Sequence, residues 1–336
     1  MKIVIATDAW APQINGVVTT LGKMGEELTQ IGNDVKYITP KEFKTFPCPS
    51  YPSIRLAILP KKKVRMILDD FKPDIVHIAT EGPLGQAARS YCLKNNLKFT
   101  TSYHTQFPEY VRLRAPIPVA WIYTFLRRFH KQASRTMVPT PSQQQKLIDR
   151  NFSNVVVWPR GVDTELFKPR AKDFIDAKRP VSMYMGRVAV EKNIEAFLEL
   201  DLSGTKYVIG DGPDLPALKK KYPDVKFTGF KRGKELAQYL AAADVFVFPS
   251  LTDTYGLVML EAMACGVPVA AFPVTGPIDV VVQGKTGILD KDLNKAVLEA
   301  LELNPQDCIA YAKSKSWRSC AKTFFNHLEP NLVSAK

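Results

Sequence analysis

The sequence predicts an α/β protein made of two doubly wound domains in tandem, each with a parallel sheet covered by helices on both faces. Short runs rich in Val and Ile recur along the chain, and amphipathic stretches separate them. The alternation stops at residues 160–163, where a polar, Lys-rich segment continues to Pro180, and then restarts. A length of 336 residues also fits two domains of roughly 150 residues each.

The first half contains six candidate strands. We expect them at residues 3–7, 35–39, 75–79, 99–103, 136–138 and 155–158. Helices fill the gaps, and the clearest spans residues 17–31. There, apolar side chains recur at steps of three and four, and Gly32 follows the last of them.

The second half repeats the pattern. We expect strands at residues 181–186, 206–209, 225–228, 245–248 and 267–272, and helices at residues 194–200, 215–221, 233–242 and 258–264. A last helix, at about residues 316–328, would carry Trp317, Phe324 and Phe325 onto one of the domains. The predicted division is an N-terminal domain at 1–165, a C-terminal domain at 166–312, and a terminal helix at 313–336 that packs back on the first domain.

The composition excludes several classes of protein. With 46% hydrophobic and 24% charged residues, the chain can bury a core and does not resemble a disordered tail. No apolar stretch approaches the roughly 20 residues of a membrane span, and the first ten residues lack the pattern of a secretory signal. Five cysteines without a close CxxC pair argue against a disulfide framework and against a zinc site. We therefore expect a cytoplasmic protein.

The net charge of +13 is unevenly distributed. Residues 1–165 hold 23 Lys and Arg against 13 Asp and Glu, and residues 166–336 hold 23 against 20. Such an excess suggests a polyanionic partner for the first half, either nucleic acid or an anionic membrane surface. Charge alone leaves both open.

Loops that directly follow strands are the places to search for function, because ligands of such sheets bind at the carboxyl ends of the strands. In the first loop, residues 7–17, Gly16 lets backbone amides approach an anion at the start of a helix. A turn that simply needs a glycine is the alternative. After the strand at 181–185, Arg187 and Lys192 would suit a pyrophosphate, unless they are only a solvated pair.

Two further loops carry chemistry. Asp253 follows the strand at 245–248, and Glu261 lies in the next helix among apolar residues, where a carboxylate needs partners such as ribose hydroxyls. Two surface acids are the alternative. His104 follows the strand at 99–103, although a lone His there is often structural. The other histidines, His77, His130 and His327, are assigned no role.

The motifs in these four loops resemble those of glycosyltransferase family 4, whose members are retaining enzymes of the GT-B fold. The resemblance covers nearly the whole chain, and its motifs are Gly16-Val17, His104 in Tyr-His-Thr, Arg187, Lys192, the Gly-Asp-Gly-Pro turn at 210–213 and the block at 253–268. The block has the family's two acids with seven residues between them. Its first acid is Asp253 where the family usually has Glu, and the shorter side chain could alter which sugar is held. Residues 80–83, 250–256 and 275–279 are most similar to the branch that makes glycolipids on diacylglycerol, which includes sulfolipid synthases.

The resemblance implies two Rossmann-like domains that face a central cleft. A nucleotide sugar, which we expect to be a UDP-sugar, would be held mainly by the second domain. Arg187 and Lys192 would neutralise the leaving diphosphate with help from the amides of Gly16 and Val17, and Asp253 would hold sugar hydroxyls. His104 would contact the sugar beside the reacting carbon. The remaining donor-binding residues would be Gly210, Phe230, Tyr255, Gly256, Leu257, Val258 and Glu261, the last of them on the ribose. No metal and no cofactor is expected, and the departing phosphate would help to deprotonate the acceptor hydroxyl.

The basic first half then fits an anionic membrane that supplies a lipid acceptor. The residues expected to dock there are Lys61, Lys62, Lys63, Arg65, Arg112, Arg114, Trp121, Arg127 and Arg128. A helix that begins near Pro118 would turn aromatic and leucine side chains toward lipid, unless that helix only packs on the core. We therefore expect peripheral association with the inner face of the membrane.

Competing interpretations explain less. A nucleic-acid-binding protein would leave Asp253 and Glu261 unexplained, because carboxylates repel phosphates. A nicotinamide dehydrogenase would need a glycine-rich fingerprint after its first strand. The alternative that stays open is a family 4 transferase that acts on a soluble sugar, a polyprenyl-linked glycan or phosphatidylinositol.

Overall fold

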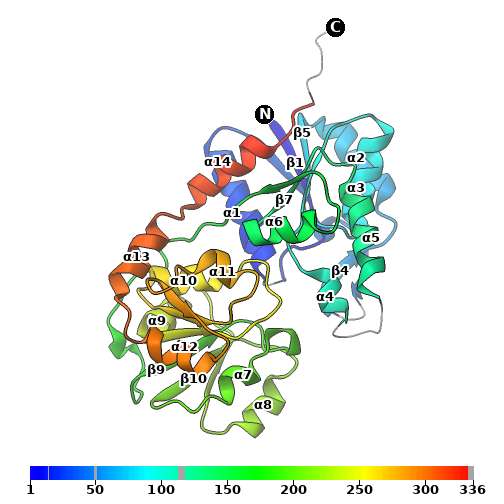
Figure 1. The fold of residues 1–336 in the computed structure, drawn as a ribbon. Coiled ribbons are helices and arrows are strands. Elements are labelled where there is room, and N and C mark those ends of the chain that lie inside the picture. The colour runs from blue at the N-terminus through cyan, green and yellow to red at the C-terminus, as the bar shows by residue number, and fades with distance from the viewer. Residues whose placement is uncertain (14, 49–50, 113–117, 332–336) are drawn as a thin grey trace. The chain divides into compact units, whose positions relative to one another are not determined.

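The computed structural model describes residues 1–13, 15–48, 51–112 and 118–331, with backbone alone at 51–53. The chain divides into two compact units (Figure 1). Unit 1 consists of Met1–Pro159 together with Trp317–Lys336, and unit 2 is Arg160–Ser316. The sequence placed these boundaries at 165/166 and 312/313, a few residues from where the units divide.

Unit 1 is built on a six-stranded parallel sheet in the order β2-β1-β5-β6-β7-β8. The strands are β1 (Lys2–Ala6), β2 (Asp34–Ile38), β5 (Ile75–Ile78), β6 (Thr100–Ser102), β7 (Arg135–Val138) and β8 (Val155–Val157). The central strands β1, β5 and β6 are buried almost throughout, and in β1 the side chains of Ile3, Val4 and Ile5 are fully buried.

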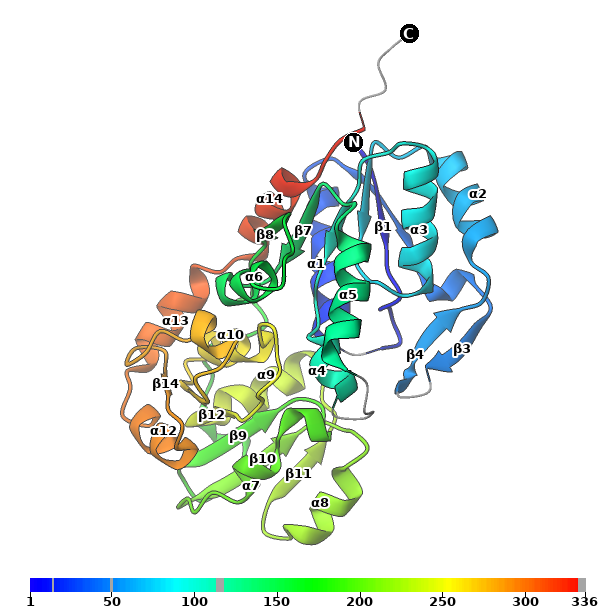
Figure 2. The same cartoon turned by 45° about the vertical axis from the view of Figure 1, so that its right-hand side comes forward.

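The helices of unit 1 cover both faces of this sheet. They are α1 (Gly16–Gln30), α2 (Lys61–Phe71), α3 (Pro83–Lys94), α4 (Phe107–Arg112), α5 (Val119–His130), α6 (Pro141–Ile148) and α14 (Trp317–His327). From β1 the chain crosses through α1 to β2 in one direction, whereas from β5 it crosses through α3 to β6 in the other. Right-handed crossovers therefore place α1 and α3 on opposite faces, as Figure 2 shows. The order of the strands reverses between β1 and β5, and a reversal of this kind opens a crevice between the two loops that follow those strands.

The C-terminal helix α14 completes unit 1. It packs beside α1, and its Phe324 ring lies 4.5 Å from that of Trp158 and 4.8 Å from that of His77. Beyond the helix, the Asn331 side chain accepts from the Lys98 amide and donates to the Lys98 carbonyl. The end of the described chain is therefore held on unit 1 by both apolar and backbone contacts.

Unit 2 repeats the architecture with a six-stranded parallel sheet in the order β11-β10-β9-β12-β13-β14. Its strands are β9 (Val181–Met185), β10 (Thr205–Ile209), β11 (Lys226–Gly229), β12 (Val245–Phe248), β13 (Val269–Ala271) and β14 (Gly287–Leu289). Its helices are α7 (Glu195–Leu198), α8 (Leu215–Lys221), α9 (Gly233–Ala242), α10 (Leu257–Ala264), α11 (Pro277–Val280), α12 (Leu293–Ala300) and α13 (Pro305–Lys313), with 3₁₀ turns η2 (Lys172–Phe174) and η3 (Val190–Lys192). Here the order of the strands reverses between β9 and β12.

Most predicted elements are present within one or two residues of their expected ends, but several features differ, and helices α11, α12 and α13 were not among the predicted ones. The strands β3 (Thr45–Cys48) and β4 (Tyr51–Ala57) pair antiparallel, and the prolines at 47, 49 and 52 in the sequence concealed them. The edge strand β14 was also missed because it has only three residues. The helix expected at 194–200 is a single turn, α7. None of the helices within the described ranges combines the length and the apolarity that a bilayer span requires.

One charged cluster ties the start of unit 2 together. The Asp244 carboxylate lies 2.6 Å from Lys172 Nζ and 2.7 Å from Arg179 Nη1, and it accepts a 2.7 Å hydrogen bond from the Val181 amide at the start of β9. Burial by itself would raise the pKa of the Asp244 carboxyl, but these partners outweigh it and lower the pKa below its usual value. The cluster thus joins η2, β9 and the end of α9.

We predict that Asp244→Ala lowers the free energy of unfolding by about 2 kcal/mol or more, because the change leaves two cations and the amide of Val181 without their carboxylate partner. Denaturant unfolding followed by circular dichroism measures the change. The matched control is Glu235→Ala, which removes an exposed ion pair with Lys231 in the same unit and should cost less than about 1 kcal/mol. Equal losses in the two variants would contradict the role given to Asp244.

Candidate functional site

The loops that follow β9 and β12 meet where the strand order of unit 2 reverses, and they bring together two of the predicted residues. Lys192, at the end of η3, donates to both carboxylate oxygens of Asp253 at 2.6 and 2.8 Å. The Asn193 side chain donates to the Pro249 carbonyl at 3.0 Å, and Thr252 Oγ1 donates to the Glu191 carbonyl at 3.2 Å. A cation and a carboxylate that lie far apart in the sequence are therefore held as a pair at the strand ends.

The glycines of the neighbouring loops allow a close approach of backbone to backbone. A Cβ on Gly210 would lie 1.8 Å from the Gly186 carbonyl oxygen, and one on Gly212 would lie 2.1 Å from that of Val188. The Val188 amide also donates to the Asp211 carbonyl at 3.0 Å. The Gly-Asp-Gly turn after β10 thus lies flat against the Gly186-Arg187 loop after β9, and this packing positions Arg187, whose side chain is exposed.

Helix α10 begins beside the Lys192–Asp253 pair. Gly256 precedes it with φ of +84°, a left-handed conformation that favours glycine, and a Cβ there would lie 2.7 Å from Met259 Cε. The backbone amides of Leu257 and Val258 form the first turn of this helix, where the macrodipole favours an anion. The Tyr255 hydroxyl contacts the Arg160 carbonyl at 3.5 Å.

Glu261 lies one turn further along α10. Its side chain is half-buried, with buried Leu260 and Met263 beside it in the helix. Burial raises the pKa of the Glu261 carboxyl from 4.5 to about 7. A partly buried carboxyl group is stabilised by hydrogen-bond donors such as ribose hydroxyls. Phe230, predicted to lie near the base, is exposed after β11, with the Arg232 guanidinium 4.9 Å from its ring centre.

The raised pKa of Glu261 predicts a stability change with pH. Because the folded chain holds this proton more tightly than the unfolded chain, the stabilisation is complete below about pH 4.5 and is lost as pH rises to about 7. Partial exposure reduces the full effect, so we expect about 1 to 3 kcal/mol.

Glu261→Gln removes this titration. We expect the difference in unfolding free energy between the variant and the unmodified chain to shift in favour of the variant between pH 5 and pH 8, as measured by denaturant unfolding. If the two chains differed in unfolding free energy by the same amount at both pH values, the raised pKa of Glu261 would be contradicted.

In unit 1, the first turn of the helix that follows the first predicted loop is already capped by a side chain. Asn15 Oδ1 accepts from the amides of Val17 and Val18 at 3.1 and 3.0 Å and so caps α1. Of the two amides predicted to bind an anion, that of Val17 would have to be shared with this side chain. Capping thus accounts for part of the signal that the sequence carried at Gly16.

The same loop joins the one after β5 through Asp8. The Asp8 carboxylate accepts from the Thr80 hydroxyl at 2.8 Å and from the amides of Leu84 and Gly85 at 3.0 and 3.4 Å, so it caps α3. Burial raises the pKa of the Asp8 carboxyl, although these three donors oppose the rise and the nearby Glu81 charge adds to it. Asp8 was not among the predicted site residues, although its position two residues after the end of β1 was the available signal.

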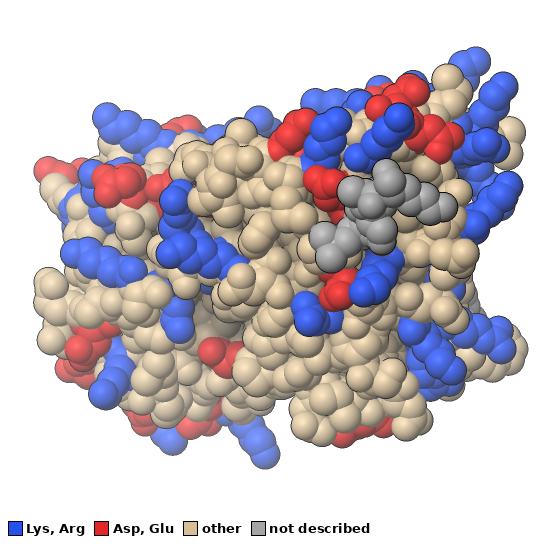
Figure 3. Space-filling view, turned by 90° about the horizontal axis from the view of Figure 1, so that it is seen from above, with Lys and Arg blue, Asp and Glu red and all other residues tan. Residues whose placement is uncertain are grey.

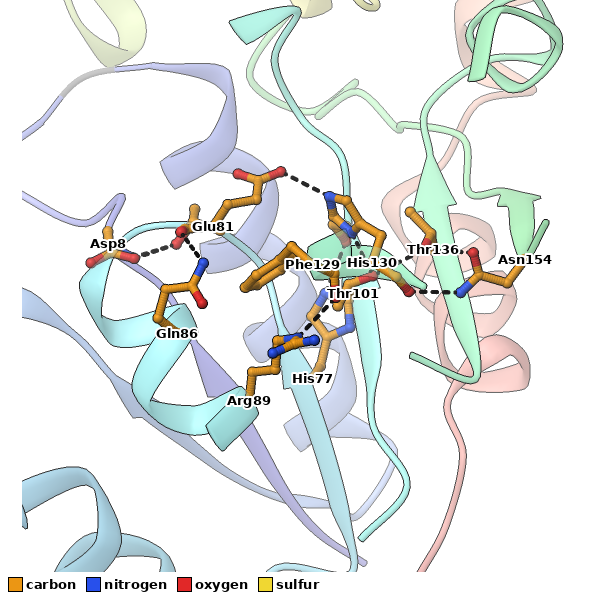
Figure 4. Close-up of polar contacts among 12 residues, drawn as sticks. Asp8, His77, Glu81, Gln86, Arg89, Thr101, Phe129, His130, Thr136 and Asn154 are labelled. Carbon is orange, nitrogen blue, oxygen red and sulfur yellow. Dashed lines mark hydrogen bonds and ion pairs between the residues drawn. The ribbon is translucent and has the colours of Figure 1, made fainter. Parts of the chain in front are cut away.

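His104 and the other histidines occupy distinct surroundings. The His104 ring is half-buried, 5.8 Å from the ring of Trp158. His77 is fully buried between Thr100 Oγ1 and Ser102 Oγ, at 2.9 Å from each, as expected for a structural residue. His130, which was assigned no role, is also fully buried, but it binds Glu81 at the carboxyl end of β5 (Figure 4).

The predicted membrane-docking residues fall on three helices. Lys61, Lys62, Lys63 and Arg65 are exposed on α2, next to Leu59, of which 89% is exposed. Arg112 is exposed on α4, and Arg114 lies outside the described residues. On the face seen in Figure 3, Lys and Arg are interspersed with Asp and Glu. The charge excess therefore does not form one continuous basic patch there.

The prediction that the aromatic and leucine side chains of helix α5 turn toward lipid was partly wrong. Tyr123, Leu126 and Phe129 are buried against unit 1 rather than turned outward, because they recur on the core-facing side of the helix. Trp121 is 73% exposed, and Arg128 is exposed as well. Arg127 is half-buried and donates to the Arg150 carbonyl at 3.1 Å.

Comparison with known proteins agrees with this geometry. Residues 14–166 match the model of Glycosyltransferase Family 4, and residues 179–303 match that of Glycosyl transferases group 1. A GDP-mannose-dependent alpha-mannosyltransferase of Mycolicibacterium smegmatis is 32% identical over 86% of this chain and 84% of its own. The Sulfoquinovosyl transferase SQD2 of Arabidopsis thaliana is 32% identical over 78% of this chain and 58% of its own.

Two further similarities cover almost the whole chain. An Alpha-monoglucosyldiacylglycerol synthase of Acholeplasma laidlawii is 27% identical over 98% of both chains. The structure of a sucrose-phosphate synthase from Thermosynechococcus elongatus superposes with a TM-score of 0.76 at 21% identity over 97% of both chains, which shows a shared GT-B fold. With two parallel-sheet Rossmann-like units and these matches, the chain belongs to glycosyltransferase family 4 and is a glycosyltransferase.

Proposed function

We propose that this glycosyltransferase moves a sugar from a UDP-sugar to a hydroxyl of a membrane lipid such as diacylglycerol, with retention of the anomeric configuration. The observation that carries the proposal is the Lys192–Asp253 pair at the strand ends of unit 2, beside the first turn of α10. Two similar proteins support the lipid acceptor. One is the Alpha-monoglucosyldiacylglycerol synthase that matches 98% of this chain, and the other is the Sulfoquinovosyl transferase.

The Lys192–Asp253 pair has the charges needed to bind a nucleotide sugar where its sugar joins the diphosphate. Asp253 would accept from sugar hydroxyls, while Lys192 and Arg187 would attract phosphate oxygens, so that both parts of the donor would be held side by side. Glu261 would accept from the ribose. These charges would stabilise the diphosphate as it leaves.

The reaction would then proceed on one face of the sugar. The bond from the anomeric carbon to the diphosphate oxygen breaks, and the acceptor oxygen forms a bond to the same carbon from the same side. The acceptor hydroxyl proton passes to the departing phosphate. His104 would contact the sugar, and no metal ion is required in this proposal.

The membrane part of the proposal now rests on α2 and α5. Leu59 lies directly before Lys61 and Lys62, and an exposed apolar side chain next to lysines suits the boundary of an anionic bilayer. Trp121 on α5 would add an aromatic anchor.

A second candidate is a GDP-mannose-dependent mannosyltransferase. Relatives with that name in Mycolicibacterium smegmatis and Mycobacterium tuberculosis are 32% and 28% identical to this chain. The shorter Asp253, where the family usually has Glu, leaves the choice of sugar to experiment.

A direct test measures nucleoside diphosphate release by the purified chain. UDP-glucose, UDP-galactose, UDP-glucuronate and GDP-mannose are offered in turn, with vesicles of phosphatidylcholine and phosphatidylglycerol that contain or lack dioleoylglycerol. We expect release with one UDP-sugar, only when dioleoylglycerol is present, and a loss of about 100-fold or more in kcat/KM in Lys192→Ala. The exposed-residue control Lys219→Ala should match the unmodified chain. Release with GDP-mannose alone would favour the second candidate.

Vesicle cosedimentation tests the membrane surface separately. The double change Lys61→Ala and Lys62→Ala should weaken binding to phosphatidylglycerol vesicles by about tenfold or more at low salt, because each lysine near the surface contributes about 1 kcal/mol. The matched control removes Lys219 and Lys220, two exposed lysines of α8 in unit 2. Equal binding to anionic and neutral vesicles by the unmodified chain would remove this surface from the proposal.

A further inference from the structure

Glu81 lies at the point of unit 1 where the strand order reverses. It follows β5, and the loop that follows the adjacent β1 is tied to it by the hydrogen bonds of Asp8 to Thr80, Leu84 and Gly85. The equivalent position in unit 2 holds the Lys192–Asp253 pair. A parallel sheet of this kind binds ligands in the crevice at such a reversal, so Glu81 stands where a ligand of unit 1 is expected.

One oxygen of Glu81 is held by a buried imidazole. His130 is fully buried, its Nε2 lies 3.1 Å from Glu81 Oε1, and its Nδ1 lies 2.9 Å from Thr101 Oγ1. Thr101 Oγ1 is 3.1 Å from Thr136 Oγ1, which is 3.3 Å from Asn154 Oδ1. Figure 4 shows this line of contacts running from the Glu81 carboxylate into the interior.

The direction of each hydrogen bond follows from the far end of the line. Asn154 Nδ2 donates to the backbone carbonyls of His130 and Ala133 at 3.0 and 2.7 Å, so Asn154 Oδ1 can only accept. Thr136 must therefore donate to Asn154, and with its single proton used it must accept from Thr101. Thr101 in turn must accept from His130, so Nδ1 carries a proton.

The last bond then contains one proton between Nε2 and Glu81. A carboxylate only accepts, so an ionised Glu81 requires a proton on Nε2 and a charged imidazolium. Whichever atom carries that proton, the hydrogen bond holds Oε1 of Glu81 against Nε2 of His130.

The Glu81 side chain is partly accessible to solvent. A quarter of its side chain is exposed, while the His130 ring has no exposure at all. Asp8 lies close enough for its carboxyl to respond to the Glu81 charge. Two neighbouring carboxyl groups disfavour a phosphate here and favour a group that donates a hydrogen bond, such as an alcohol.

We propose that Glu81 accepts a hydrogen bond from a hydroxyl of the sugar-accepting substrate, and that His130 is the positioning residue that holds its carboxylate for this contact. The proposal rests on the proposed function, because it assigns a role toward the acceptor. It names a neutral, hydroxyl-bearing acceptor head group as the ligand of the unit 1 crevice.

The first test uses lipid-dependent nucleotide release with dioleoylglycerol in phosphatidylcholine and phosphatidylglycerol vesicles. Glu81→Gln should raise the KM for dioleoylglycerol by about tenfold or more, with the KM for the sugar donor and the affinity for UDP unchanged. The matched control is Glu27→Gln, which changes a half-buried glutamate of α1 that pairs with Arg318 in the same unit. An unchanged acceptor KM in Glu81→Gln, or an equal rise in both KM values, would overturn the proposal.

Two variants of His130 separate positioning from folding. The amide nitrogen of His130→Gln can occupy the place of Nε2 and still donate to Glu81, whereas the shorter His130→Asn can reach only Thr101. We expect His130→Gln to keep an acceptor KM closer to that of the unmodified chain than His130→Asn does, at similar thermal unfolding midpoints. The opposite order would contradict a positioning role, and this comparison holds even where Glu81→Gln folds poorly.

Ring ¹⁵N NMR tests the line of hydrogen bonds without any acceptor. In the unmodified chain, Nδ1 of His130 should carry a proton, and the signal is assigned by its absence in His130→Gln. An Nδ1 without a proton would overturn the arrangement that holds Glu81, whereas the absence of lipid-dependent release with a protonated Nδ1 would count against the proposed function instead.

Discussion

The opposed directions of the crossovers in each sheet are the constraint on which the rest of the structure depends. Because a right-handed connection must place its helix on one particular face, reversing the strand order sends successive helices to opposite faces. The loops after the two central strands then lie side by side at the reversal, while the helices that follow them go to opposite faces. In unit 2 this brings Lys192 beside Asp253, and in unit 1 it brings Asp8 near Glu81.

At both crevices, a carboxylate is paired with a side chain from another part of the chain. Lys192 is held by Asp253, whereas Glu81 is held by an imidazole that belongs to α5. The two arrangements differ in what they present. Unit 2 combines cations with the first turn of α10, which suits a diphosphate, whereas unit 1 presents carboxyl groups, which suit hydroxyls. This difference in chemistry fits a donor and an acceptor handled by different units.

The periodic elements could be predicted from the sequence because buried parallel strands are short apolar runs and their helices are amphipathic. The helices at 215–221 and 233–242 have the predicted ends, and the final helix has nearly the predicted span. Elements without such a signal were missed, such as the Pro-rich antiparallel pair of β3 and β4 and the three-residue edge strand β14. The outward orientation expected for Leu126 was wrong, because an amphipathic pattern does not reveal whether its apolar face meets the core or a lipid.

By itself, the sequence determined the α/β class, the family and the strand-end loops, since these depend on local pattern and on motifs such as Asp253 to Glu261. Only the tertiary structure decided which side chains meet. The contact of His130 with Glu81 joins residues 49 positions apart, and that of Lys192 with Asp253 joins residues 61 positions apart. Such pairs depend on how the strands are ordered in the sheet, and no local pattern in the chain encodes that order. The same reason explains why His130 was assigned no role: its surroundings come entirely from other elements.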